Sequence, residues 1–119
     1  MTSGGDELMA VSNAMVRLHK EQFGRGPTKA QSRYAGPDIL VCTLEAALTP
    51  AERNLVELGE GQRVREMRVA FQAATASRFT GAVEEITGRK VRAFMSALDA
   101  EQEVAVEFFM FEADPAKVG

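Results

Sequence analysis

The segment Val104–Glu112 constrains the fold most, because its pattern predicts a β-strand with large apolar side chains on both faces. Both faces of any sheet that contains this strand therefore need a cover. The helices predicted below suffice for one face and part of the other, so we expect a second chain to cover the remainder. The sequence thus predicts a homodimer whose candidate interface residues are Phe108, Phe109, Met110 and Phe111.

The other strand-like segments predict an α+β domain. Val104–Glu112 is expected to form a hairpin with Lys90–Leu98 across the acidic segment 99–103. Ile39–Leu44 is β-branched and apolar on both faces, which is typical of a covered strand, and Gln31–Tyr34 predicts a short polar edge strand. We therefore expect a four-stranded, mainly antiparallel sheet in an α-β-β-α-α-β-β chain order, with the helices packed mostly on one face.

Two shorter helices have clear signals. Residues 6–23 carry apolar residues at helical spacing and stop at Gly24. In the second helix, which is expected to run to about Leu58, Thr49 caps the start, Pro50 suits the first turn and Glu52 completes a capping box. The stripe of the first helix consists of Leu8, Val11, Met15 and Leu18.

A longer helix is predicted over residues 62–87, with a change of phase near Arg78 and a kink or close packing at Gly81. Gly88 is its expected stop. Its arginines, Arg68 among them, are interpreted as part of a solvated face. The predicted apolar stripe consists of Val64, Met67, Phe71, Ala74, Phe79, Ala82, Val83 and Ile86.

The length and charge of the chain limit its class. A chain of 119 residues predicts a single domain, with an ordered core over about residues 7–112. A net charge of -3 disfavours general nucleic-acid binding. Because no apolar run approaches the roughly 20 residues of a membrane span and no signal peptide is visible, we expect no direct membrane insertion and a cytoplasmic location, peripheral to the membrane through a protein partner.

No set of residues predicts catalysis, a metal site or a cofactor. His19 lies beside charged residues on the first predicted helix and is expected to face water. A zinc site would need a second His or Cys at ligand spacing. Cys42 lies within an apolar strand, so we interpret it as a buried structural thiol in a reducing compartment. The protein is therefore expected not to be an enzyme.

The segment Gly24–Lys29 is the candidate ligand site. Its glycines free backbone amides, and Arg25, Gly26, Thr28 and Lys29, with Arg33 beyond them, could contact a phosphate or carboxylate. It is not a P-loop, because it follows a helix and leads into a strand. The alternative interpretation is a helix stop followed by a solvated basic loop.

Five segments together resemble the MpsC family, which is named for a proposed sodium-translocating, membrane-potential-generating system. The resemblance covers about residues 7–112 and depends on the order and spacing of Gly24–Lys29, Leu48–Arg53, Val64–Arg68, Glu85–Phe94 and Ala105–Phe109. It implies an accessory component beside a membrane-embedded ion-transport machine, without an assigned catalytic residue.

The chain departs from the family pattern at two places. It has Ala46 and Ala47 where the resemblance implies a glycine, and Ala97 where an acidic residue would follow Ser96. The function predicted from the resemblance is a non-catalytic interaction module with a membrane transport protein as partner. The alternative is a sensor of an anionic small molecule that uses the Gly24–Lys29 segment.

Overall fold

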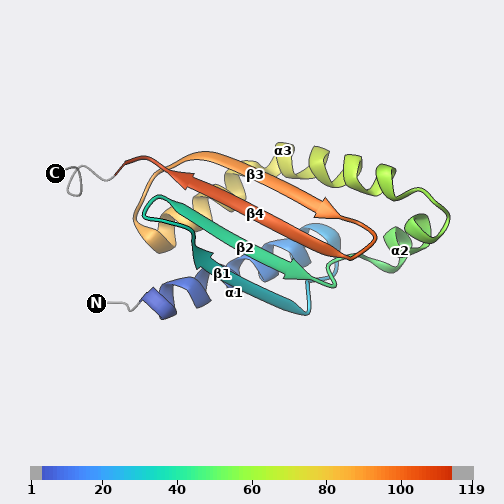
Figure 1. The fold of residues 1–119 in the computed structure, drawn as a ribbon, viewed down its shortest axis with the longest axis horizontal. Coiled ribbons are helices and arrows are strands. Elements are labelled where there is room, and N and C mark those ends of the chain that lie inside the picture. The colour runs from blue at the N-terminus through green and yellow to red at the C-terminus, as the bar shows by residue number, and fades with distance from the viewer. Residues whose placement is uncertain (1–3, 114–119) are drawn as a thin grey trace.

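The structure, a computed structural model that describes residues 4–113, confirms the predicted α+β class (Figure 1). Helices and strands follow one another in the predicted order, and most predicted ends lie within two residues of the observed ones. The elements are α1 (Gly4–Phe23), β1 (Lys29–Tyr34), β2 (Ile39–Glu45), α2 (Pro50–Glu57), α3 (Gly61–Thr87), β3 (Val91–Asp99) and β4 (Val104–Phe111).

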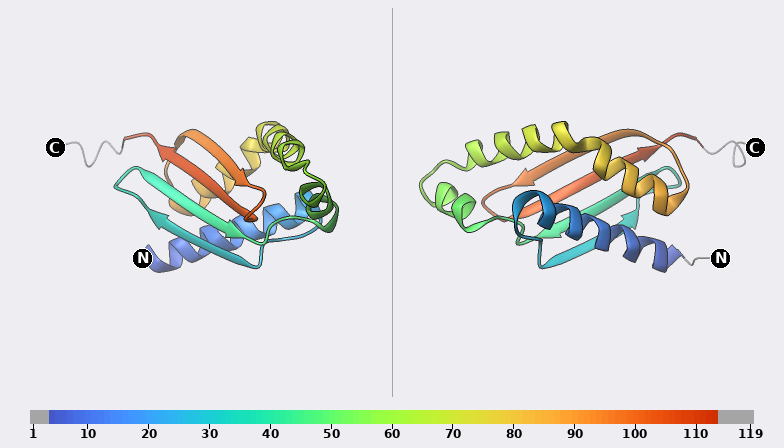
Figure 2. Two further views of the ribbon diagram at one scale, coloured as in Figure 1. Left: turned by 45° about the vertical axis from the view of Figure 1, so that its right-hand side comes forward. Right: turned by 180° about the vertical axis from the view of Figure 1, so that it is seen from behind.

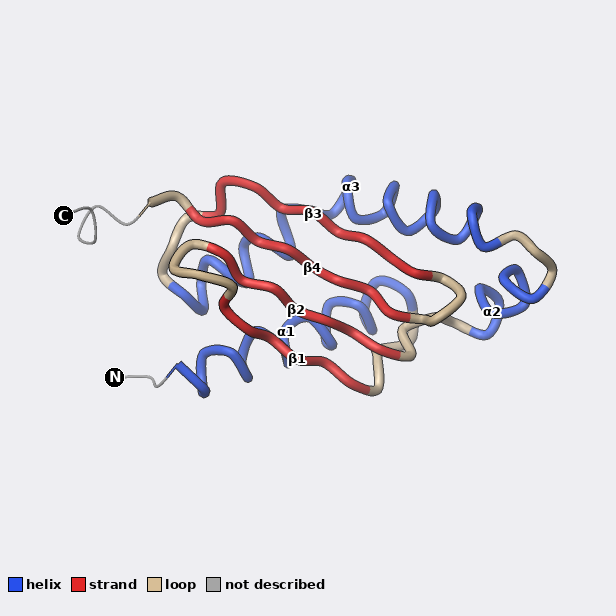
Figure 3. The backbone as a smooth tube through the Cα atoms, in the orientation of Figure 1, coloured by secondary structure: helices blue, strands red, loops and turns tan. Residues whose placement is uncertain are grey.

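The four strands form one antiparallel sheet in the order β1-β2-β4-β3 (Figure 3). The C-terminal strand β4 therefore lies between β2 and its hairpin partner β3. Helices α1 and α3 lie behind the sheet in Figure 1 and in front of it in the reversed view of Figure 2. One face of the sheet is thus covered by helices, and no helix of the described chain crosses the other.

The predicted start of α2 is confirmed in detail. The Thr49 hydroxyl accepts a hydrogen bond from the Glu52 amide at 3.2 Å, and the Glu52 carboxylate accepts one from the Thr49 amide at 2.8 Å. Pro50 stands in the first turn, where no amide donor is needed. This reciprocal cap fixes the direction in which the chain leaves β2.

The main core lies between the sheet and the two long helices. Alternate residues of β2 and β4 point toward the helices and are fully or almost fully buried. Phe94 stacks on Phe109 with ring centroids 5.0 Å apart and on Phe79 of α3 at 5.9 Å. The buried core residues are Val11, Ala14, Met15, Leu18, Leu40, Cys42, Leu44, Phe79, Val83, Ala105, Phe109 and Phe111.

The predicted stripe of α3 is confirmed at Val64 and is wrong at Met67 and Phe71. Met67 and Phe71 are 42% and 44% exposed, whereas Arg68 and Gln72, one position further on, are buried. The irregularity in the helix lies at Thr75, whose φ of -118° is not helical, and not at Gly81. These two polar side chains can be buried because Arg68 and Gln72 each have a hydrogen-bonding partner inside the fold.

Candidate interaction surface

The open face is the side of the sheet that the helices leave uncovered. Side chains alternate along a strand, so the residues between the buried positions of β2 and β4 point to this side. The centre of this face, around Phe108, is mostly apolar. The open face consists of Lys29, Gln31, Arg33, Ile39, Val41, Thr43, Glu45, Ala93, Met95, Ala97, Asp99, Val104, Val106, Phe108 and Met110.

The strand register arranges the open face in rows that run across the strands. The row at one end is charged on both edges, because Lys29 of β1 and Asp99 of β3 flank Glu45 and Val104. The following rows become apolar toward the other end of the sheet. They are Gln31-Thr43-Val106-Ala97, then Arg33-Val41-Phe108-Met95, then Ile39-Met110-Ala93.

The structure divides the four candidate interface residues between the two faces. Phe109 and Phe111 are 0% and 1% exposed and belong to the core beneath the helices. Phe108 and Met110 alternate with them and reach the open face. An interface built on the sheet would therefore use Phe108 and Met110, with Val41 and Met95 as neighbours that the sequence did not single out.

The candidate ligand loop does not gather its residues at one point. Gly26 is packed against α1, since a Cβ there would lie 3.3 Å from Val16 Cγ1 and 3.3 Å from the Val16 carbonyl oxygen. The Thr28 amide donates to the Glu45 carbonyl at 3.0 Å, and Lys29 Nζ lies 3.5 Å from Glu45. Arg25 is half-buried in the same loop. Anion sensing by this loop stays a prediction.

Arg33 lies on the open face, two positions beyond Gln31 on β1. It borders a hollow of about 360 Å³ whose other lining residues include Gln31, Tyr34, Val41 and Thr43. Lys29 and Arg33 thus share the open face but stand four residues apart along an extended strand, about 13 Å. They form the basic edge of the open face.

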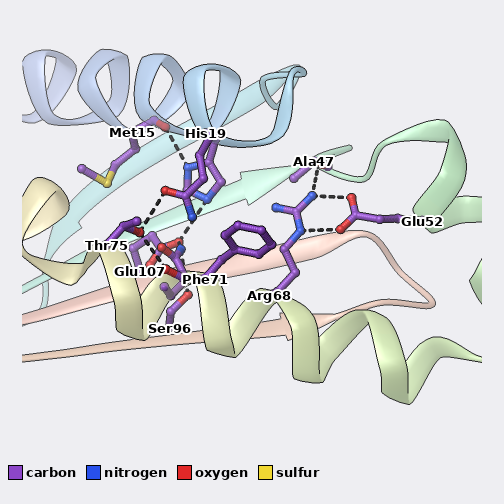
Figure 4. A network of polar contacts seen from close by, with 11 residues as sticks. Met15, His19, Ala47, Glu52, Arg68, Phe71, Thr75, Ser96 and Glu107 are labelled. Atoms are coloured by element: carbon purple, nitrogen blue, oxygen red, sulfur yellow. Dashed lines mark hydrogen bonds and ion pairs between the residues drawn. The ribbon is translucent and has the colours of Figure 1, made fainter.

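His19 is buried, not solvent-facing as predicted. It is 2% exposed, and its Nε2 lies 3.2 Å from Oε1 of Glu107, which is 0% exposed (Figure 4). Gln72 Nε2 donates to the same carboxylate oxygen at 2.6 Å and contacts Ser96 Oγ at 3.3 Å. A polar network therefore joins α1, α3, β3 and β4 inside the core; its members are His19, Gln72, Ser96 and Glu107.

The contacts of His19 determine how many protons the network holds. Nδ1 lies 2.8 Å from the Met15 carbonyl oxygen, which only accepts hydrogen bonds, so Nδ1 carries a hydrogen. The contact between Nε2 and Glu107 then needs one further proton, either on the imidazole or on the carboxyl group. In both forms the pair has no net charge, which lowers the cost of burying it.

A second buried pair joins α2 to α3. Arg68 donates to Glu52 through Nε at 2.7 Å and through Nη2 at 2.6 Å, and Nη2 also donates to the Ala47 carbonyl at 2.9 Å. The Arg68 guanidinium stacks 3.7 Å from the centre of the Phe23 ring. Burial alone would raise the pKa of Glu52, but the hydrogen bonds from Arg68 and Thr49 outweigh it and hold that pKa below its ordinary value.

The burial of His19 and of Glu107 had signals in the sequence that hydropathy alone concealed. Val11, Met15 and His19 are four residues apart, so His19 continues the buried stripe of α1. Glu107 lies between Ala105 and Phe109 on the same, buried face of β4. Position within the period would have placed both in the core.

The thiol of Cys42 is buried, as predicted. It is 0% exposed, and burial raises its pKa to about 11. Among residues 4–113 no three His, Cys, Asp or Glu side chains come together as metal ligands. In the same part of the chain, none of the helices has the length and apolar character needed to cross a bilayer.

The described residues form a small α+β protein whose sheet has one face covered by helices and one open face. The profile of the family described as "Na+-translocating membrane potential-generating system (MpsC)" matches residues 7–113. The chain therefore belongs to the MpsC family. It is 29% identical over 103 residues to the uncharacterized protein YrhF of Bacillus subtilis (strain 168), which covers 84% of each chain. No solved structure matches significantly.

Proposed function

We propose that this protein is a non-catalytic accessory module that works as a homodimer and pairs through the open face of its sheet. The observation that carries the proposal is the one-sided cover of the sheet. Phe109 and Phe111 lie under the helices, while Phe108 and Met110 point to the face that no described helix crosses.

Apolar side chains in water favour association. Burial of apolar surface contributes about 25 cal/mol per Å², and a contiguous apolar patch on a small protein is a common protein–protein interaction site. The open face combines such a centre, around Val41 and Phe108, with a charged row that contains Lys29 and Asp99. This layout, an apolar centre beside a polar border, is typical of protein–protein interfaces.

The family description supports a membrane-potential-generating system as the setting of this module. In that setting the protein acts at the membrane by binding a transport protein. None of its described helices is long and apolar enough to cross a bilayer. The loop beside the open face, with Arg25 as its basic side chain outside the dimer contact, forms the surface proposed to contact that partner.

The test of dimerisation is sedimentation velocity over a range of concentrations on the wild type and on Phe108→Glu. We expect a dimer for the wild type and a monomer for the variant, because a carboxylate at the centre of the interface would be buried without a partner. Leu58→Glu is the matched control. Leu58 is 77% exposed at the end of α2, away from the sheet, so its change should leave the dimer intact.

Circular dichroism and melting temperature must show that both variants remain folded. A wild type that sediments as a monomer at every concentration would contradict the proposal. For the partner, the folded charge-reversal variant Arg25→Glu is compared with the wild type in affinity capture from membranes of the native host. Capture of the same transport subunit by both proteins would exclude Arg25 from that contact.

A further inference from the structure

The rows of the open face restrict how two copies can pair. Two sheets that pack face to face keep their strands nearly aligned, about 10 Å apart. A two-fold axis between them can then run either along the strands or across them. The two choices bring different rows together, so the register distinguishes them.

An axis across the strands places the charged row of one copy on the apolar row of the other. Asp99 of one copy would face Ala93 of the other, whereas Glu45 faces an apolar residue under either axis, Ile39 here and Val104 with the other axis. The Asp99 carboxylate would lose water without gaining a partner, which costs free energy. This arrangement is therefore disfavoured.

An axis along the strands places every row on the same row of the second copy, with its order reversed. Strand β2 then faces β4 of the second copy, and β1 faces its β3. Val41 meets Phe108, Ile39 meets Met110, and the apolar rows cover one another. In the charged row, Lys29 meets Asp99, and the symmetry makes that contact twice.

We propose that the homodimer forms about an axis parallel to the strands, with Lys29 of each copy paired to Asp99 of the other. The inference rests on the proposed dimer and adds its geometry and its charge pairing. The charges are available for the contact. Lys29 has a side chain that is 70% exposed and a 3.5 Å contact with Glu45. Asp99 is exposed at the end of β3, where its Oδ1 accepts a hydrogen bond from the Gln102 amide at 2.9 Å.

The test uses two single variants, Lys29→Asp and Asp99→Lys. Each variant alone places like charges at both contacts of its homodimer. An equimolar mixture allows a heterodimer in which the introduced aspartate of one chain meets the introduced lysine of the other. The native Asp99 and Lys29 meet at the second contact, so both contacts are attractive. Changes within each chain are the same alone and in the mixture, so they cannot produce this preference.

Native mass spectrometry and sedimentation at low salt measure the result. We expect each variant alone to dimerise about tenfold more weakly than the wild type, and the mixture to recover most of that loss as heterodimer. The preference should shrink at about 1 M salt, where charges are screened within roughly 3 Å. Arg63→Asp and Glu57→Lys, on the helices, are the matched control pair and should show no preference.

The pairing would be overturned if the mixture contained no more heterodimer than random exchange of subunits produces. If the wild type is nevertheless a dimer that Phe108→Glu dissociates, the open-face dimer stands and only the axis is wrong. A wild type that remains monomeric removes both the dimer and this pairing.

Discussion

His19 Nε2 lies 3.2 Å from Glu107 Oε1, which joins α1 to the middle of β4 through two side chains that are almost completely buried. The contact lies under the face of the sheet opposite to Phe108. It couples the helical layer to the strand whose other side forms the centre of the open face. The stability of β4, and with it the open face, therefore depends on this pair.

Replacement of Glu107 should show that dependence. Glu107→Ala leaves His19 and Gln72 without their hydrogen-bonding partner and opens a cavity, so we expect a loss of about 3 to 5 kcal/mol in the free energy of unfolding. Glu107→Gln keeps the shape and one polar contact and should lose clearly less. Urea denaturation at neutral pH measures both. An alanine variant within about 1 kcal/mol of the wild type, the loss typical of an ordinary substitution, would show that the network contributes little.

The acid stability of the protein should depend on Glu52. Hydrogen bonds from Arg68 and Thr49 hold the pKa of Glu52 below its unfolded value, roughly 4.3, against the opposing effect of burial. The unfolded chain therefore binds the proton first as the pH falls. The stability that Glu52 contributes is complete above that value and is lost as the pH falls through the lower pKa of the folded protein.

Urea denaturation of the wild type and Glu52→Gln between pH 7 and pH 3 tests this. The variant lacks the titrating group, so the advantage of the wild type should shrink below about pH 4. A difference that stays constant over the whole range would mean that the pair does not couple folding to that proton. Arg53→Gln provides the control. The partner of Arg53, Glu103, is partly exposed, so this variant should change the acid profile little.

The thiol of Cys42 should be inert in the folded protein. Burial raises its pKa to about 11, so the reactive thiolate is scarce near pH 8, and the side chain is 0% exposed. We expect a disulfide exchange reagent such as dithionitrobenzoate to label Cys42 only after unfolding in urea. Fast labelling of the native protein would reveal an opening of β2 from the helices.

Local sequence signals predicted most of the fold and little of the candidate site. The cap at Thr49 and Glu52 and the period-two pattern of β4 act over a few residues, so they could be interpreted directly. The burial of Arg68 could not be predicted in this way, because its partner Glu52 belongs to another helix and no local pattern in the sequence pairs the two residues. Likewise, only the register placed Lys29 and Asp99 in the same row.

The connection from β2 to α2 contains a backbone position where glycine would fit better. Ala46 has a φ of 57°, in the left-handed region that costs a residue with a Cβ about 1 kcal/mol, and its amide donates to the Glu103 carbonyl at 3.0 Å. This is also where the resemblance to the family implied a glycine. Ala47, next to it, is 1% exposed and has no such backbone conformation.

Glycine at these two positions should therefore have opposite effects. In Ala46→Gly the relief of strain offsets the greater entropy of the unfolded chain, so the free energy of unfolding should stay equal or rise by up to about 1 kcal/mol. In Ala47→Gly the entropy of the unfolded chain also increases, and a buried methyl group is lost. The free energy of unfolding should therefore fall by about 1 kcal/mol or more. Thermal and urea unfolding of both variants gives the comparison. An Ala46→Gly protein less stable than Ala47→Gly would mean that the turn requires the alanine side chain.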